Sequence, residues 1–224
     1  ELGVVLVDIG GGTTDLCVFL EGALAYSAVL PVGARHITND LAVGLRISLE
    51  SAEKIKLFLT KKPKTAAEPA AAGAKKINDD EINIKELLLP EELNKISRKT
   101  LTEGIIKPRL LEIFSLINLE LEKNGLLGMT PSGVVITGGG AETVGVIEAC
   151  KQRLSLPVRV GLPDGLTGLI DELANPASSA VSGLILYGGS YAPAAKKTNF
   201  SLSLGNPFAK MKSKLPSLLK NFLP

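Results

Sequence analysis

Three consecutive glycines between two apolar runs constrain the fold of this chain more than any other feature. Residues 2–9 (LGVVLVDI) form a β-branched apolar run that stops at residues 10–12 (GGG), and residues 14–20 resume a strand pattern. A third such run, residues 23–30, follows after a Glu-Gly turn. Short apolar runs bounded by turn residues are typical of buried strands. The sequence therefore predicts an opening meander of three strands joined by tight turns.

Helical periodicity replaces the strand pattern after the third run. Ile37, Leu41 and Leu45 are four residues apart, which predicts a first helix, and residues 48–59 predict a second. Residues 60–81 then lose all apolar periodicity and are rich in Ala, Lys and Pro. Such a stretch is typical of a solvated insert, so we expect a spacer or subdomain loop there.

The second half of the chain alternates between helix and strand patterns. Order returns at residues 82–89, and the long helix that follows carries Pro108 either in a first turn or at a kink. The later elements, in the order helix, strand, helix, strand, helix, are predicted at residues 97–124, 133–137, 143–154, 157–161 and 176–187. Together with the opening meander, this order predicts a mixed α/β domain.

Composition excludes several classes of function. The 25 Lys and Arg against 23 Asp and Glu leave a formal net charge of only +2. The overall electrostatic field of the protein therefore does not favour binding of nucleic acid. Cys17, Cys150 and the single histidine, His36, offer no metal-ligand spacing, and two unpatterned cysteines suit a reducing cytoplasm. No apolar run is long enough to span a membrane. Because Glu1 leads at once into a strand pattern, we expect that sequence upstream is missing.

The segment from Asp8 to Asp15 is the strongest candidate for chemistry. Glycines at 10–12 let a hairpin turn bring bare backbone N–H groups against an anion, and phosphate is the natural guest. Asp8 at the strand end is placed to hold Mg²⁺ through water, and the hydroxyls of Thr13 and Thr14 are within reach of terminal phosphates. We expect Asp15 to pair with the turn. The alternative is a ligand-free glycine hairpin with an Asx cap.

Two further groups point to a nucleotide. Residues 136–142 (ITGGGAE) form a second strand-to-glycine-to-helix unit, where glycines 138–140 allow an adenosine to lie against the backbone. A ligand-free corner uses glycines in the same way. Glu53 and Lys56 lie three apart on one helical face and can point to one ligand, although a surface ion pair has the same spacing.

These motifs resemble those of the actin/Hsp70/sugar-kinase ATPase superfamily. Residues 8–15 match every position of its phosphate-2 motif, Asp-apolar-Gly-Gly-Gly-Thr-x-Asp, residues 136–142 resemble its adenosine motif, and residues 175–183 resemble its hinge helix. The resemblance implies ATP and Mg²⁺ as cofactors, with Asp8 holding Mg²⁺ through water and the Glu-x-x-Lys helix meeting adenine and ribose. The implied cofactor-binding residues are Asp8, Gly10, Gly11, Gly12, Thr13, Thr14, Glu53, Lys56, Gly138, Gly139 and Gly140.

Two strings resemble one branch of this superfamily, the FtsA family of bacterial cell-division proteins: residues 32–42 and residues 106–114. The branch implies an actin-like, ribonuclease H-like α/β fold with a mixed five-stranded sheet flanked by helices. The implied divisions are an actin-like nucleotide-binding domain at 1–59 and 97–187, an insert subdomain at 60–96, a linker at 188–204 and an amphipathic membrane-targeting helix at 205–224.

The tail carries a physical pattern of its own. Apolar residues recur at spacings of three and four with lysines among them, as an interfacial membrane helix requires. The alternative is a helix that docks in a partner's groove, and Pro216 would kink either one. The expected membrane-contacting residues are Phe208, Met211, Leu215, Leu218, Leu219, Phe222 and Leu223.

The family resemblance implies an ATP-binding protein that tethers the FtsZ tail and other division proteins to the cytoplasmic membrane at the septum and self-associates into actin-like polymers. We expect weak ATPase activity at most in the complete protein. We expect no catalytic residue in this chain alone, because phosphoryl transfer requires both walls of a cleft to close around phosphate and metal. The alternatives are an Hsp70-like ATPase, a PilM-type adaptor or a nucleotide-free interaction module.

Overall fold

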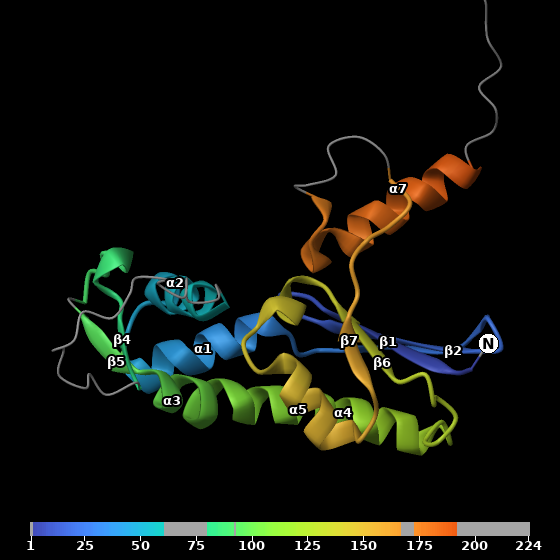
Figure 1. Ribbon diagram of the computed structural model, residues 1–224, viewed down its shortest axis with the longest axis horizontal. Coiled ribbons are helices and arrows are strands. Elements are labelled where there is room, and N and C mark those ends of the chain that lie inside the picture. Colours follow the sequence, from blue (N-terminus) through green and yellow to red (C-terminus); the bar gives the residue numbers. More distant parts are fainter. Residues whose placement is uncertain (1, 61–79, 92, 167–172, 192–224) are drawn as a thin grey trace, which may run out of the picture. The chain divides into compact units, whose positions relative to one another are not determined.

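The computed structural model describes residues 2–60, 80–91, 93–166 and 173–191. The chain divides into two compact units, Glu1–Tyr187 and Gly188–Pro224, and the account below concerns the first. Its centre is a five-stranded sheet in the order β3-β2-β1-β6-β7 (Figure 1). The strands are β1 (Val4–Ile9), β2 (Thr14–Leu20), β3 (Ala23–Leu30), β6 (Val134–Thr137) and β7 (Val158–Val160).

The sheet is mixed, as the sequence predicts. β1 pairs antiparallel with β2, and β2 pairs antiparallel with β3, which confirms the three-stranded meander. β6 pairs parallel with both β1 and β7. Parallel neighbours require a crossover connection, and the long helical segment before β6 supplies it. The glycine turn after β1 and the glycine loop after β6 therefore emerge at the same edge of the sheet.

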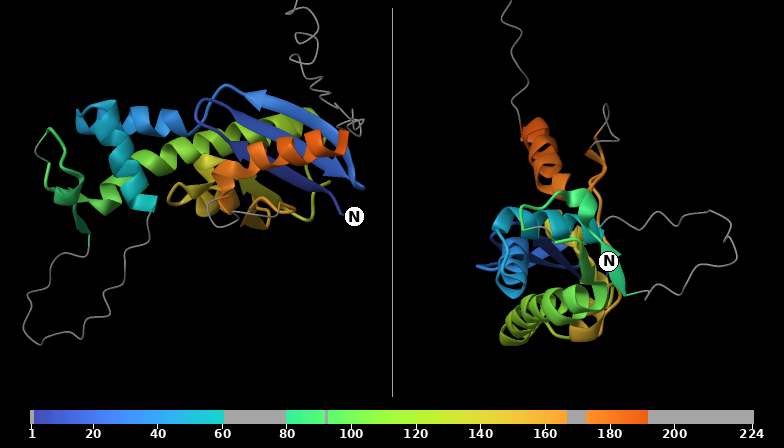
Figure 2. Two further views of the ribbon diagram at one scale, coloured as in Figure 1. Left: turned by 90° about the horizontal axis from the view of Figure 1, so that it is seen from above. Right: turned by 90° about the vertical axis from the view of Figure 1, so that its left-hand side faces the viewer.

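Helices surround the sheet and extend from one end of it. Figures 1 and 2 show α4 and α5 against one face, while α1, α2 and a small β4–β5 ribbon project beyond the sheet. The helices and the ribbon are α1 (Ala34–Leu45), α2 (Leu49–Thr60), α3 (Arg98–Leu101), α4 (Lys107–Lys123), α5 (Val146–Leu154), α7 (Ser179–Tyr191), β4 (Glu81–Asn83) and β5 (Lys95–Ser97).

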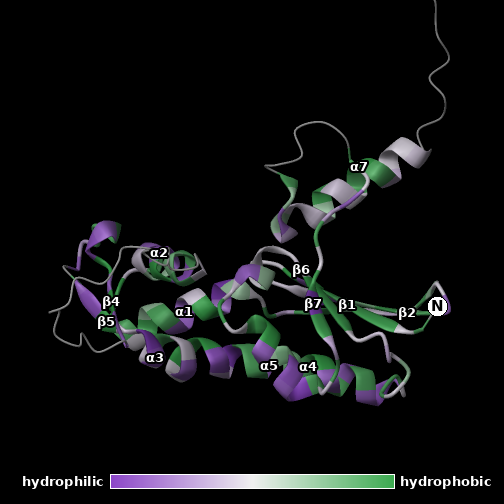
Figure 3. Ribbon diagram, viewed as in Figure 1, coloured by the Kyte–Doolittle hydropathy of each residue, from purple (hydrophilic) through white to green (hydrophobic). Residues whose placement is uncertain are grey.

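The core follows the period of each element. In β1, the alternate residues Val5, Val7 and Ile9 are fully buried, and in α4 the buried residues include Ile113 and Phe114. Figure 3 shows hydrophobic colouring on the strands and hydrophilic residues on the outer side of α4. The apolar stripe of α4 packs on the apolar face of the sheet, and this burial supplies most of the stabilising free energy.

The long helix predicted at 97–124 is interrupted near its start. α3 passes into a π-helical turn at Thr102–Ile106, and α4 begins directly afterwards with Pro108 in its first turn. Proline has no N–H to donate to the carbonyl four residues earlier. The π turn before Pro108 changes the positions of the preceding carbonyls, so this missing hydrogen bond is accommodated. Of the two predicted positions for Pro108, the first-turn position is confirmed.

Two predicted helix boundaries are wrong. The helix predicted from residue 143 begins at Val146, because Gly139–Glu142 forms a 3-10 turn and Gly145 has a φ of 81°. The helix predicted to end at 187 continues to Tyr191. Its two glycines at 188 and 189 do not stop it, since each glycine inside a helix costs only about 1 kcal/mol relative to alanine.

Three predicted regions lie largely or wholly outside the described residues. They are most of the insert (61–79), most of the linker (192–204) and the whole amphipathic tail (205–224). Within the described ranges, no helix is long and apolar enough to cross a membrane.

Candidate functional site

The glycine turn after β1 presents unpaired donors. The Gly10 amide donates to the Thr13 carbonyl at 2.9 Å, which closes the turn. In the described part of the chain, the amides of Gly11, Gly12 and Thr13 have no hydrogen-bond acceptor. Successive free N–H groups on a tight turn make an anion-binding concavity. The turn therefore has the donors that the sequence predicts for it.

The first turn of α1 holds the other side of the glycine turn. The Ala34 and Arg35 amides donate to the carbonyls of Gly10 and Gly11 at 2.9 and 2.8 Å. A side chain at Gly33 is excluded, because its Cβ would lie 2.7 Å from the Gly10 carbonyl oxygen. His36 completes the cap, since its Nδ1 accepts the Gly33 amide at 3.1 Å. The carbonyls of the turn thus face α1, which leaves the free amides for a ligand.

The two threonines of the motif differ in position. Thr13 is exposed, and its hydroxyl donates to Asp15 at 3.5 Å, in line with the expected pairing of Asp15 with the turn. Thr14 is fully buried, and its hydroxyl donates to the Val32 carbonyl at 2.7 Å. The structure contradicts the predicted phosphate contact of Thr14, because the register of β2 turns that side chain into the core.

Asp8 lies opposite Asp15 across the β1–β2 pair. Burial, and then the charge of Asp15, raise the pKa of the Asp8 carboxyl above its ordinary value. A Cβ at Gly138 would overlap with Asp8 Oδ1, so glycine at 138 keeps the space beside this carboxylate open. Within the described ranges, no group of three or more His, Cys, Asp or Glu residues forms a metal cage.

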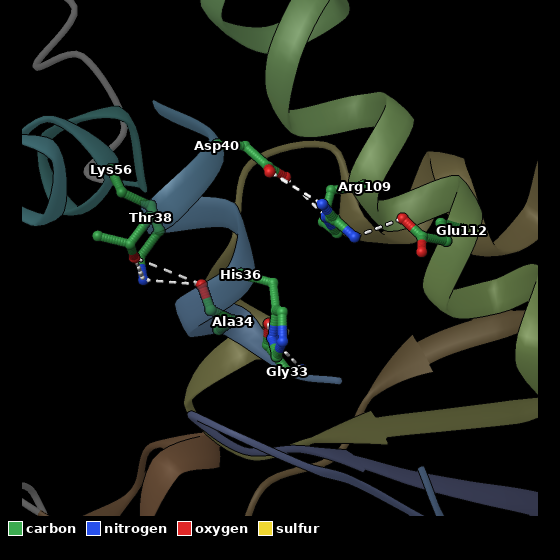
Figure 4. A network of polar contacts seen from close by, with 8 residues as sticks. All are labelled: Gly33, Ala34, His36, Thr38, Asp40, Lys56, Arg109 and Glu112. Atoms are coloured by element: carbon green, nitrogen blue, oxygen red, sulfur yellow. Dashed lines mark hydrogen bonds and ion pairs between the residues drawn. The ribbon is translucent and has the colours of Figure 1, made fainter. Parts of the chain in front are cut away.

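A lysine, a glutamate and a threonine form a polar network between α1 and α2, and Figure 4 shows its lysine and threonine. Lys56 is only 8% exposed, and its ammonium bonds to Glu53 Oε2 at 2.7 Å, Thr38 Oγ1 at 2.9 Å and the Ala34 carbonyl at 3.4 Å. The Thr38 hydroxyl donates to Glu53 Oε2 at 2.5 Å. All three donors of Lys56 are thus satisfied within the protein. Lys56 holds Glu53 in place, and Glu53 is the member that faces outward.

Burial raises the pKa of Glu53, but the hydrogen bonds from Lys56 and Thr38 outweigh it, so the net pKa lies below the ordinary value. Glu53 is therefore ionised at neutral pH and acts as a hydrogen-bond acceptor only.

The glycine loop after β6 is fixed from two sides. The Gly138 amide donates to the Pro176 carbonyl at 3.0 Å, and the Thr137 hydroxyl donates to Ser179 Oγ at 2.6 Å, which ties the loop to the start of α7. On its other side, a Cβ at Gly140 would lie 2.7 Å from Ile9 Cβ. The loop rests directly on the end of β1 because its glycines have no side chains.

A pocket of about 570 Å³ joins these segments. It brings together six predicted site residues from three distant parts of the sequence: Gly10, Gly11, Glu53, Lys56, Gly139 and Gly140. The remaining predicted residues, Asp8, Gly12, Thr13, Thr14 and Gly138, are not part of its lining. A volume of this size lies within the usual range for a small-molecule or cofactor site.

Sequence reasoning assigned no role to several residues that line the pocket. Arg35, Thr38 and Asn39 come from α1, and Glu142 follows the second glycine loop. A signal was present, since the α1 residues lie within the string that resembles the FtsA family. Their helical spacing alone could not show which of them face a ligand, because the pocket is made by packing α1 against α2.

Two acidic groups hold the surrounding helices in place. Asp40 on α1 accepts a bidentate pair of hydrogen bonds from Arg109 Nε and Nη2 on α4, at 2.6 and 2.9 Å, and Arg109 also binds Glu112 (Figure 4).

Glu91 caps α2 by accepting hydrogen bonds from the Ser48 amide and the Ser51 hydroxyl, and these bonds hold the pKa of Glu91 at about 2. Local sequence patterns could not predict the Asp40–Arg109 contact or the Glu91 cap, because the partners are more than 39 residues apart in the sequence.

The same folding unit occurs in solved structures. MreB 5 of Spiroplasma citri, bound to AMPPNP, aligns with a TM-score of 0.58 at 20% identity over 84% of this chain and 53% of that chain. The PilM-PilN type IV pilus biogenesis complex aligns with a TM-score of 0.57 at 18% identity over 84% of this chain and 46% of that one. These similarities confirm the predicted actin-like α/β fold with a mixed five-stranded sheet flanked by helices.

Comparison with proteins of similar sequence shows to which family the chain belongs. The cell division protein FtsA of Pseudomonas aeruginosa is 38% identical over 188 residues, which are 84% of this chain and 42% of that protein. The FtsA of Escherichia coli K12 is 34% identical over 198 residues, or 84% of this chain and 44% of that protein. The chain thus spans less than half the length of these relatives. A family model described as cell division protein FtsA matches residues 5–183, and the chain accordingly belongs to the FtsA family.

Proposed function

We propose that this chain is the nucleotide-binding half of an FtsA-type, actin-like cell-division protein and that its pocket takes ATP. One observation carries the proposal: a single 570 Å³ pocket is lined by the glycine turn, the Glu53–Lys56 face of α2 and the second glycine loop. These are the three segments that the superfamily motifs assign to phosphates, ribose and adenosine. The neighbouring fold of MreB 5 is known in complex with AMPPNP and with ADP, which supports the same class of ligand.

Each segment suits one part of the nucleotide. The free amides of Gly11, Gly12 and Thr13 would bind phosphate oxygens, and the nearby Arg35 adds a positive charge. The Glu53 carboxylate would accept ribose hydroxyls. Gly139 and Gly140 leave a stretch of backbone without side chains, against which an adenine ring would lie.

The residues present fit a magnesium ion held through water. Mg²⁺ keeps several waters and takes one or two carboxylates together with substrate phosphates. Asp8 supplies such a carboxylate beside the turn, where its raised pKa reflects burial and a neighbouring negative charge. A bound cation would relieve both effects. The ion itself would neutralise phosphate charge, while Asp8 would orient its water shell.

An ATP titration tests the proposal. We expect the 224-residue chain to bind ATP, and a Gly11→Ala variant to bind it at least about tenfold more weakly, because a methyl group then occupies the phosphate concavity. A Cβ at Gly11 meets no protein atom within 4 Å, so the fold is retained. Isothermal titration calorimetry with Mg·ATP up to millimolar concentration is a suitable measurement.

The matched control is Gly104→Ala. This glycine also has free space around it but lies in the π turn, away from the pocket, and its substitution should leave ATP affinity unchanged. If the unmodified chain binds no ATP, the proposed function is wrong for this chain. If Gly11→Ala binds as well as the control, the turn is not the phosphate site.

We further propose that the tail tethers the protein, and through it FtsZ and other division proteins, to the cytoplasmic membrane at the septum. The apolar and basic pattern from Phe208 to Leu223 supports this, together with membership of the FtsA family. Self-association into actin-like polymers, with the insert subdomain of 60–96 as a contact region, belongs to the same proposal. Any ATP hydrolysis would be weak and would require the rest of the protein.

Sedimentation with anionic liposomes tests the tether. We expect the chain to pellet with the vesicles and a version ending at Leu204 to stay in solution, because the truncation removes the whole apolar and basic pattern. A Leu218→Glu variant, which keeps the length, should bind far more weakly. If the chain stays in solution in every form, the membrane part of the proposal falls and the nucleotide part stands.

A further inference from the structure

Helix α1 contacts both the proposed phosphate end and the proposed ribose end of the pocket. Its first turn holds the glycine turn through the amides of Ala34 and Arg35. One turn later, Thr38 bonds to Glu53 and Lys56 on α2, and Figure 4 shows the contact with Lys56. The Ala34 carbonyl also accepts from Lys56, so a single stretch of α1 fixes the two ends relative to each other.

The Thr38 hydroxyl has a specific place in this arrangement. It is buried, accepts from the Lys56 ammonium and donates its only proton to Glu53 Oε2. Lys56 bonds to the same oxygen of Glu53. The other oxygen, Oε1, has no partner among the described residues, while the Glu53 side chain is 43% exposed and lines the pocket. One carboxylate oxygen is thus immobilised and the other is left for a ligand.

We propose that Thr38 is a positioning residue for nucleotide selection: its hydroxyl fixes Glu53 Oε2 so that Oε1 faces the ribose hydroxyls. The inference rests on the proposed ATP site and adds a residue from α1 to it. A fixed, ionised acceptor favours a ligand that carries a donor at that point. A deoxyribose lacks one of these donors and leaves the carboxylate partly unsatisfied, which lowers its affinity. The pocket therefore distinguishes ribonucleotides from deoxyribonucleotides through Thr38.

The test uses the 224-residue chain and compares ATP with its 2′-deoxy and 3′-deoxy forms. We expect the unmodified chain to bind ATP about tenfold or more tightly than at least one deoxy form, which corresponds to one ribose hydrogen bond to a charged group. Thr38→Val keeps the shape of the side chain but removes the hydroxyl. In this variant the ratio of ATP to deoxy-ATP affinity should fall clearly below that of the unmodified chain, because Lys56 alone then holds Glu53.

Three controls separate positioning from general damage. Thr38→Ser restores the hydroxyl and should restore the ratio. Inorganic tripolyphosphate, which has no ribose, should bind the unmodified chain and Thr38→Val equally, showing that the glycine turn is intact. Thr38→Ala serves as a second hydroxyl-free variant if valine does not fit, and the same loss of selectivity is expected.

The possible outcomes are distinct. If the unmodified chain does not bind ATP, the proposed function fails, and with it the basis of this inference. If ATP binds and the deoxy ratio in Thr38→Val and Thr38→Ala equals that of the unmodified chain, Thr38 has no positioning role and the proposed function stands. A loss of tripolyphosphate binding in both variants would also overturn the inference, because the effect would then be structural.

Discussion

Replacing Gly138 with alanine is expected to lower the free energy of unfolding by about 3–5 kcal/mol. Gly138 has φ 80° and ψ 168°, a backbone region essentially reserved for glycine, which alone costs about 1–3 kcal/mol for another residue. The new Cβ would also overlap with Asp8 Oδ1 and lie 2.6 Å from the Ile9 carbonyl oxygen. The Ile9 carbonyl is part of the β1 backbone and cannot move without disturbing the sheet, while the Asp8 carboxylate would have to rotate away.

Gly139→Ala is the matched control for this prediction. Its Cβ would meet only the Ala177 Cβ, at an ordinary distance of 3.8 Å, and its φ is not in the left-handed region. We expect its free energy of unfolding, measured by urea denaturation, to stay within about 0.5 kcal/mol of the unmodified chain. Its ATP affinity should fall, because Gly139 lines the pocket. Equal stability of the two variants would contradict the assigned backbone geometry.

Replacing Ile9 with alanine is expected to cost about 2–5 kcal/mol. Ile9 is fully buried at the end of β1, and its side chain fills the space directly beneath Gly140. Removing it leaves a cavity under the second glycine loop, and the surrounding structure can collapse only partly because the loop is held by the Gly138 and Thr137 hydrogen bonds. Urea denaturation followed by circular dichroism measures the loss.

Ile9→Val provides the graded comparison. It removes one methyl group and should cost about 0.5–1.5 kcal/mol. We also expect Ile9→Ala, under conditions where it remains folded, to weaken ATP binding more than Ile9→Val, because the loop above the cavity loses its support. If alanine and valine destabilise the chain equally, Ile9 does not support the loop in the way that its burial indicates.

Local sequence patterns predicted the strands well and the helix ends less well. The β1–β2–β3 meander follows from apolar runs and glycine turns, both of which are short-range signals. The π turn between α3 and α4 and the later start of α5, after a 3-10 turn, were not predicted, because such turns have no clear sequence signature. Helix α7 continues through Gly188 and Gly189 to Tyr191, beyond its predicted end at residue 187.

The candidate site likewise combines features that local sequence patterns predict with features that they do not. The glycine turn, the second glycine loop and the Glu53–Lys56 pair were identifiable one by one, because each is a short motif with its own backbone chemistry. That Thr14 is turned into the core depends on strand register, which only the paired sheet specifies. That Thr38 bonds to Glu53 depends on how α1 packs against α2.

The sequence by itself determined the class of fold, the family and the candidate glycine and Glu-x-x-Lys motifs, since turns, apolar periods and glycine strings are local properties. Only the tertiary structure decided that six of the predicted site residues line one pocket, that all three donors of Lys56 are bonded within the protein, and that Thr38 on α1 contacts Glu53 and Lys56 on α2. The physical reason is distance along the chain. Hydrogen bonds between α1 and α2, or between β6 and α7, form between residues that no local pattern relates.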